Sequence, residues 1–68
     1  MKFIQLGNLM VNLNTIKSFE FHYKSHSITI TYIDNSVEPI VNLTYEEFMH
    51  IRRAIWRNSV NFELSCTQ

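Results

Sequence analysis

The chain has 68 residues, and six basic and six acidic side chains give it a formal net charge of zero at pH 7. This balance argues against a protein whose main work is to neutralise the phosphates of a nucleic acid. The length allows a single domain, covering residues 1–68, and a domain of this size buries only about 60% of the surface of its unfolded chain. Such small domains often depend on an additional stabiliser.

Two common stabilisers are not expected here. Cys66 is the only cysteine, so the monomer has no internal disulfide, and no His/Cys spacing typical of a metal site is present. No cofactor is expected, and a homo-oligomer remains the simplest stabiliser. The apolar start over residues 1–6 is too short for a signal peptide, and no segment approaches the roughly 20 apolar residues of a membrane span. A cytoplasmic location without membrane contact is therefore expected.

The first elements in chain order are two short strands. A strand is predicted over residues 3–6, followed by a two-residue turn at Gly7-Asn8, where both residue types tolerate positive φ. The chain then returns as a second strand over 9–13. Asn14 and Thr15 interrupt the apolar pattern and predict a bend held by side-chain to backbone hydrogen bonds.

Three longer strands follow, separated by polar turns at 24–27 and 34–36. The segment 16–23 alternates cleanly, so two sets of side chains face opposite ways: Phe19, Phe21 and Tyr23 against Ser18, Glu20 and His22. The segment 28–33 is β-branched or aromatic throughout and is the strongest strand signal. The segment 37–43 contains Pro39, which lacks an N–H donor and therefore predicts an edge strand or a bulge.

One helix is predicted, over residues 44–58. Thr44 and Glu47 have the spacing of a capping box, in which each side chain accepts the other residue's backbone N–H. The apolar residues of this helix form two ridges. Phe48, Ile51 and Ile55 make a core ridge, which is expected to pack on the sheet layer of Phe19, Phe21, Ile28 and Ile30.

The second set of helical side chains predicts a protein interface. Tyr45, Met49 and Trp56 form a further ridge, and Arg52 falls between it and the core ridge; these four are called the interface ridge below. Tyr, Trp, Met and Arg are enriched at the centres of interfaces, and the Arg52 guanidinium has the spacing to stack on the indole or to meet a partner's carboxylate. The alternative is a curved sheet that covers both ridges, with Arg52 reaching out to solvent.

The tail, residues 59–68, carries a strand-like alternation. Val60, Phe62, Leu64 and Cys66 alternate with polar residues. Two interpretations stay open: the tail adds a strand to its own sheet, or it adds one to the sheet edge of a neighbouring molecule.

Catalysis is not predicted. His22 lies two residues from Glu20 on one strand face, His26 lies across a turn from His22, and His50 follows Glu46 by one helical turn. The Glu20/His22 pair fits a solvated sheet face, the two histidines lack a third metal ligand, and the helical pair is an ordinary surface pair. Cys66 has no base beside it in sequence. The chain is therefore expected not to be an enzyme.

Nucleic-acid binding is the alternative function. Arg52, Arg53 and Arg57 are half of the six basic residues and lie within two helical turns. Arg53 and Arg57, with His50 beside them on the polar face, are the candidate phosphate contacts. The competing interpretation is a solvated face whose charge is balanced by Glu46.

The first half of the chain resembles a known family. Residues 12–20, N-L-N-T-I-K-S-F-E, and the later I-T-I at 28–30 are similar to the N-L-x-x-I-x-x-(I/F)-E … I-T-(I/L) run of small bacterial and phage β-meander proteins of the flagellar FlbD-like type. The resemblance implies a small β-meander and a bacterial or phage origin. The chain departs from the family at Asp34-Asn35-Ser36, where a glycine turn is expected, and in its longer helix. No functional residue carries over.

Together these patterns predict an α+β fold: an antiparallel meander of four to five strands over 1–43, with one amphipathic helix packed on one face. The predicted function is a non-enzymatic protein-interaction module that self-associates, or binds another protein, through Tyr45, Met49, Arg52 and Trp56.

Overall fold

The computed structural model describes residues 3–58 and 62–67, and these residues form a small α+β fold, as the sequence predicts. The tail position Val60 lies outside the described residues. The elements are β1 (Phe3–Leu6), β2 (Leu9–Asn12), the 3-10 turn η1 (Leu13–Thr15), β3 (Ile16–His22), β4 (Ser27–Tyr32), β5 (Val37–Ile40), α1 (Tyr45–Trp56) and β6 (Glu63–Thr67).

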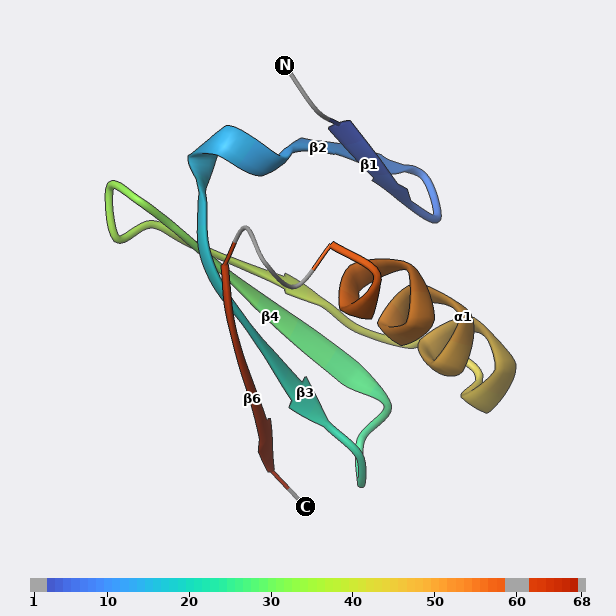
Figure 1. Cartoon of the computed structure of the whole chain (residues 1–68). Helices are drawn as coiled ribbons and strands as arrows, with labels where there is room; N and C mark the ends of the chain where they lie inside the picture. The colour runs from blue at the N-terminus through green and yellow to red at the C-terminus, as the bar shows by residue number, and fades with distance from the viewer. Residues whose placement is uncertain (1–2, 59–61, 68) are drawn as a thin grey trace.

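The strands form two sheets. β1 and β2 make an antiparallel hairpin, and the other four strands form one sheet in the order β5-β4-β3-β6. Helix α1 and the hairpin both lie over the same face of the four-stranded sheet (Figure 1). The opposite face carries polar side chains such as Ser18, Glu20 and Thr29, whose registers place them away from the core.

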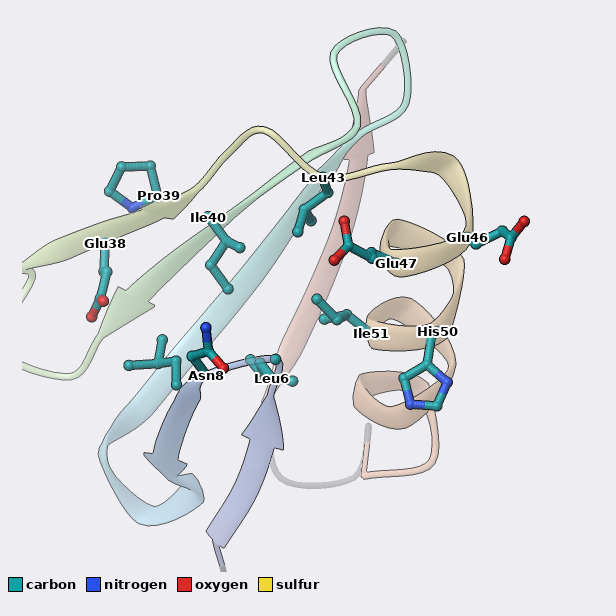
Figure 2. Close-up of a pocket in the computed structure, with 12 residues that line it drawn as sticks. Leu6, Asn8, Glu38, Pro39, Ile40, Leu43, Glu46, Glu47, His50 and Ile51 are labelled. Atoms are coloured by element: carbon teal, nitrogen blue, oxygen red, sulfur yellow. The ribbon is translucent and has the colours of Figure 1, made fainter.

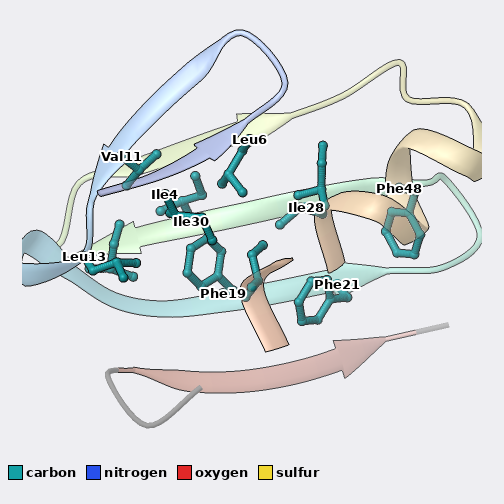
Figure 3. Close-up of a cluster of buried hydrophobic side chains, with 12 residues drawn as sticks. Ile4, Leu6, Val11, Leu13, Phe19, Phe21, Ile28, Ile30 and Phe48 are labelled. Carbon is teal, nitrogen blue, oxygen red and sulfur yellow. The ribbon is translucent and has the colours of Figure 1, made fainter. Parts of the chain in front are cut away.

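The core fills the space between these layers. Phe19, Phe21, Ile28 and Ile30 of the sheet are fully buried, and the hairpin contributes further buried aliphatic side chains. In Figure 3, Ile4, Leu6 and Val11 point from the hairpin toward the sheet. The core ridge of α1, Phe48, Ile51 and Ile55, is buried as expected. None of the buried residues that the structure describes is polar or charged, so desolvation of polar groups does not oppose burial of this core.

A bulge in β3 explains how two apolar residues of opposite parity share one face. Ile16 and Phe19 are three residues apart, so in a regular strand they would face opposite sides. The β3–β4 register shifts between Ile16 and Ser18. The extra residue, Lys17, is exposed, and both Ile16 and Phe19 are buried. The alternation predicted for residues 16–23 therefore holds from Ser18 onward. The bulge at Lys17 shifts it, so that Ile16 faces the core instead of the opposite side.

The described strands within residues 1–43 are antiparallel to their sheet neighbours, as predicted. Two further features of the sheets were not predicted. The hairpin forms its own sheet, and β6 pairs with β3 in parallel, with Phe19 opposite Leu64. The parallel direction follows from the connection: α1 carries the chain over the sheet face from the β5 edge to the β3 edge, as parallel strands require. Of the two interpretations of the tail, the structure shows the strand added to the chain's own sheet.

Strand β5 is shorter than predicted and lies at a sheet edge. The strand ends at Ile40 instead of residue 43, and Asn42 adopts a positive φ of 62°. The proline in this strand, Pro39, is opposite Thr29, and β5 is the outermost strand, as Pro39 indicates. Because Pro39 has no N–H, the free edge of β5 lacks one donor that another strand would need for pairing.

The helix begins as its sequence predicts. The Thr44 hydroxyl accepts the backbone N–H of Glu47 at 3.1 Å, and the Glu47 carboxylate accepts the N–H of Thr44 at 2.9 Å. This capping box satisfies two N–H groups that a helix start leaves without intrahelical partners. The helix ends at Trp56, and the Arg57 N–H still donates to the Arg53 carbonyl.

Candidate protein interface

The sheet does not cover the interface ridge. Tyr45 is 61% exposed and Trp56 is 44% exposed, whereas Met49 and Arg52 are half-buried. Met49 also packs against the edge of the core. Of the two sequence-based alternatives, the sheet that covers both ridges is therefore not the arrangement observed, and an aromatic side chain stands exposed at each end of the ridge.

Arg52 is held in place by two aromatic side chains. Its Nε–H donates to the Tyr23 hydroxyl at 2.6 Å, and its Cζ lies 4.6 Å from the centroid of the Trp56 ring. The stacking on the indole is the arrangement expected from sequence, and it is a cation–π contact. The hydrogen bond to Tyr23 is an additional restraint, so the guanidinium is oriented before any partner arrives.

Tyr23 also belongs to this site, although the sequence placed it only on the strand face of Phe19 and Phe21. The ring packs edge-on against Phe48 at 5.2 Å between centroids, and its hydroxyl lies 3.9 Å from the Sγ of Cys66. The alternation of β3 correctly placed Tyr23 on the face of Phe19 and Phe21. The alternation could not predict the hydrogen bond between this hydroxyl and Arg52, because Arg52 is 29 residues further along the chain.

His26 is the second residue that the sequence did not connect to the ridge. It occupies the turn between β3 and β4 with a positive φ of 50°. Its ring lies 5.8 Å from the rings of both Tyr45 and Phe48. The start of the interface ridge is thereby supported from the turn.

The charge of Arg52 is not neutralised by any described carboxylate. Across residues 3–58 and 62–67, no carboxylate forms an ion pair with its guanidinium. Its Nε–H is occupied by Tyr23, so the outer N–H groups of the guanidinium are the donors left for other acceptors. An oriented cation among exposed aromatic rings can recognise an acceptor or an aromatic group on another molecule.

The other side of α1 borders a cleft of about 650 Å³. The helix, the hairpin turn at Gly7 and Asn8, and strand β5 form its walls. Aliphatic side chains make its floor: Leu6, Leu9, Ile40, Leu43 and Ile51. In Figure 2, Glu47 points from α1 toward the cleft, whereas Glu46 points away from it.

Acidic groups dominate the charge of the cleft. Glu38 on β5 and Glu47 on α1 stand on opposite walls, and no Lys or Arg lines it. The Tyr32 hydroxyl donates to Glu38 at 2.9 Å. Burial of Tyr32 and this bonded carboxylate together raise the pKa of Tyr32 to about 12. The cleft is chemically suited to an apolar group that carries positive charge.

Of the candidate nucleic-acid contacts, only His50 borders this cleft. His50 lines it together with Glu46 and Glu47, whereas Arg53 and Arg57 are exposed further along the helix. A phosphate placed at His50 would therefore meet the repulsion of nearby carboxylates. This arrangement gives little support to the prediction that His50, Arg53 and Arg57 bind nucleic acid, which stays a prediction.

The histidines considered for catalysis do not lie together. His22 is on the open sheet face, with its Nε2 3.1 Å from the Thr29 hydroxyl and 3.7 Å from the Glu20 carboxylate. His26 contacts the helix on the opposite face. In the described part of the chain, no three His, Cys, Asp or Glu side chains are grouped in a way that could hold a metal ion.

Comparison with known proteins adds no relative. No protein-family model matches the chain, and neither do curated proteins or solved structures. The resemblance to the FlbD-like family thus stays a prediction. Among the described residues, no helix has the length and apolar character that a membrane crossing needs.

Proposed function

We propose that this protein is a non-catalytic interaction module that self-associates through the interface ridge. The observation that carries the proposal is Arg52, which Tyr23 and Trp56 hold in position within an otherwise exposed aromatic surface. A side chain fixed before binding loses less conformational entropy when a partner docks. Aromatic and Arg side chains are also the ones that most often dominate binding energy.

A second copy of the chain is the partner that this surface favours. The net charge is zero, so two copies do not repel each other as a whole. Cys66 is free and exposed, and no disulfide stabilises the described chain. Association would bury the ridge and add the stabilisation that a domain of this size gains from oligomerisation. The exposed ridge spans only a helix face, so we expect a dissociation constant on the order of 10 μM.

The mass in solution tests this proposal. Light scattering over a range of concentrations from micromolar to millimolar should show the mass rising toward two chains. Tyr45→Glu should shift the protein toward one chain, because it replaces an exposed aromatic ring with an acid, which helix starts favour. Phe3→Glu is the matched control: Phe3 is 54% exposed but lies on the hairpin, and its variant should associate normally.

Fluorescence gives a second readout. Trp56 is the only tryptophan, so its emission reports the interface ridge alone. The emission should move to shorter wavelength as concentration rises, because the half-exposed indole leaves water. A wild-type protein that stays monomeric, with emission independent of concentration, would contradict self-association.

A further inference from the structure

The four residues of the interface ridge have the spacing of a helix that packs against another helix. They lie at intervals of four, three and four residues, as the a and d positions of a heptad do. At 100° per residue they fall within an arc of about 60°. The ridge extends for about 16 Å at 1.5 Å per residue. It therefore presents a narrow, continuous seam rather than a broad patch.

The seam is symmetric about its own midpoint, which lies between His50 and Ile51. Tyr45 and Trp56 are equally far from this point, and so are Met49 and Arg52. In a two-fold pair, each contact between two different positions occurs twice. Two antiparallel helices crossing at this midpoint would therefore place Tyr45 against Trp56 of the second copy, and Met49 against Arg52, at every layer of the seam.

Charged residues flank the seam in a pattern that fits the same arrangement. Glu46 and Arg53 are exposed and follow Tyr45 and Arg52 by one position, so both lie on the side of the seam away from the core ridge. In the antiparallel pair, Glu46 of each copy faces Arg53 of the other, so the two-fold symmetry gives two equivalent ion pairs. A parallel pair would instead bring Glu46 level with Glu46, and Arg53 level with Arg53.

We infer that two copies of this chain dock with their α1 helices antiparallel across a two-fold axis, joined by the seam and by two Glu46–Arg53 ion pairs. This inference rests on the proposed self-association and specifies its geometry. Arg52, already over the Trp56 ring and bonded to Tyr23, then presents its outer side to Met49 of the second copy. The soft, unbranched Met49 side chain can adapt to that surface.

Charge exchange between the two flanking positions tests the geometry. Glu46→Arg and Arg53→Glu each place like charges opposite one another twice, and each should weaken the dimer by about tenfold. The double variant carrying both substitutions exchanges the two signs and should restore the wild-type dissociation constant. Sedimentation velocity measures all four proteins, and circular dichroism checks that each helix is intact.

A control separates local from overall charge. Lys17→Glu changes the net charge by the same amount as Arg53→Glu, at an exposed position of the β3 bulge, and should leave the dissociation constant unchanged. If the wild type dimerises but the single variants have the same dissociation constant, or the double variant does not recover it, the antiparallel geometry is overturned while self-association stands. A monomeric wild type overturns both.

Discussion

At the scale of single residues, two aromatic side chains from different parts of the chain fix the position of Arg52. Its neighbours on the helix predicted the stacking on Trp56, because the two residues are one turn apart. Arg52 also donates a hydrogen bond to the Tyr23 hydroxyl, which lies in another part of the chain, and this bond orients the guanidinium further. Tyr32 on β4 is also fixed by a hydrogen bond to another element: its hydroxyl donates to Glu38 on the neighbouring strand β5.

The raised pKa of Tyr32 predicts how stability changes with pH. The fold favours the neutral phenol, so this contribution is complete below pH 10.0, the ordinary pKa of tyrosine, and is lost as pH rises through about 12. Tyr32→Phe removes the titrating group. Urea unfolding between about pH 9 and pH 12 should therefore show a less steep decline in the variant than in the wild type.

Glu38→Gln serves as the control for this pH dependence. The amide oxygen can still accept from the Tyr32 hydroxyl, but the negative charge is gone, which leaves burial as the main cause of the shift. As pH rises from about 9 to about 12, the stability of Glu38→Gln should fall more steeply than that of Tyr32→Phe and less steeply than that of the wild type. Identical slopes in all three proteins would show that Tyr32 does not contribute.

At the scale of elements, the helix is stabilised at its start by a closed cap. The Thr44 capping box is closed by two hydrogen bonds, while the final turn carries one basic residue, Arg53, to complement the helix dipole. Thr44→Ala removes the hydroxyl that accepts the Glu47 N–H. We expect it to lower the free energy of unfolding by about 1 kcal/mol, measured by urea denaturation.

Thr44→Ser is the matched variant for the cap. Serine keeps the hydroxyl and is at least as favourable as threonine at this position of a helix, so stability should stay close to that of the wild type. If the alanine and serine variants unfold at the same urea concentration, the observed hydrogen bond does not stabilise the helix.

At the scale of the whole molecule, β6 completes the four-stranded sheet from the far end of the chain. Phe62, just before this strand, packs edge-on against the buried Phe19 ring at 4.7 Å between centroids. Phe62→Ala should lower the free energy of unfolding by about 2 kcal/mol, less than for a fully buried phenylalanine because Phe62 is only half-buried. Denaturant unfolding measures the loss.

Ser65→Ala, at an exposed position of the same strand, should change stability little. Because β6 pairs with β3 of its own chain, the effect of Phe62→Ala on stability should be the same at every protein concentration. An effect that grew with concentration would indicate that the tail pairs between molecules instead.

Local patterns in the sequence were enough to predict the helix with its cap, the hairpin, the core ridge on Phe19 and Ile28, and the edge position of β5. Each depends on residues a few positions apart, or on the burial that strand alternation and helical spacing impose. Helical spacing also placed the four residues of the interface ridge on one helix face, and their part in binding stays a prediction.

Tertiary structure decided what no local pattern encodes. The parallel pairing of β6, the bulge at Lys17, the cleft beside Glu47 and the bond from Arg52 to Tyr23 all join segments that are distant in sequence or compete for the same core. The bulge allows both Ile16 and Phe19 to be buried, and the free energy of burying both side chains exceeds the cost of one interrupted strand pairing. The sequence thus determined which helix face carries the interface ridge, and the fold determined which groups orient Arg52 within it.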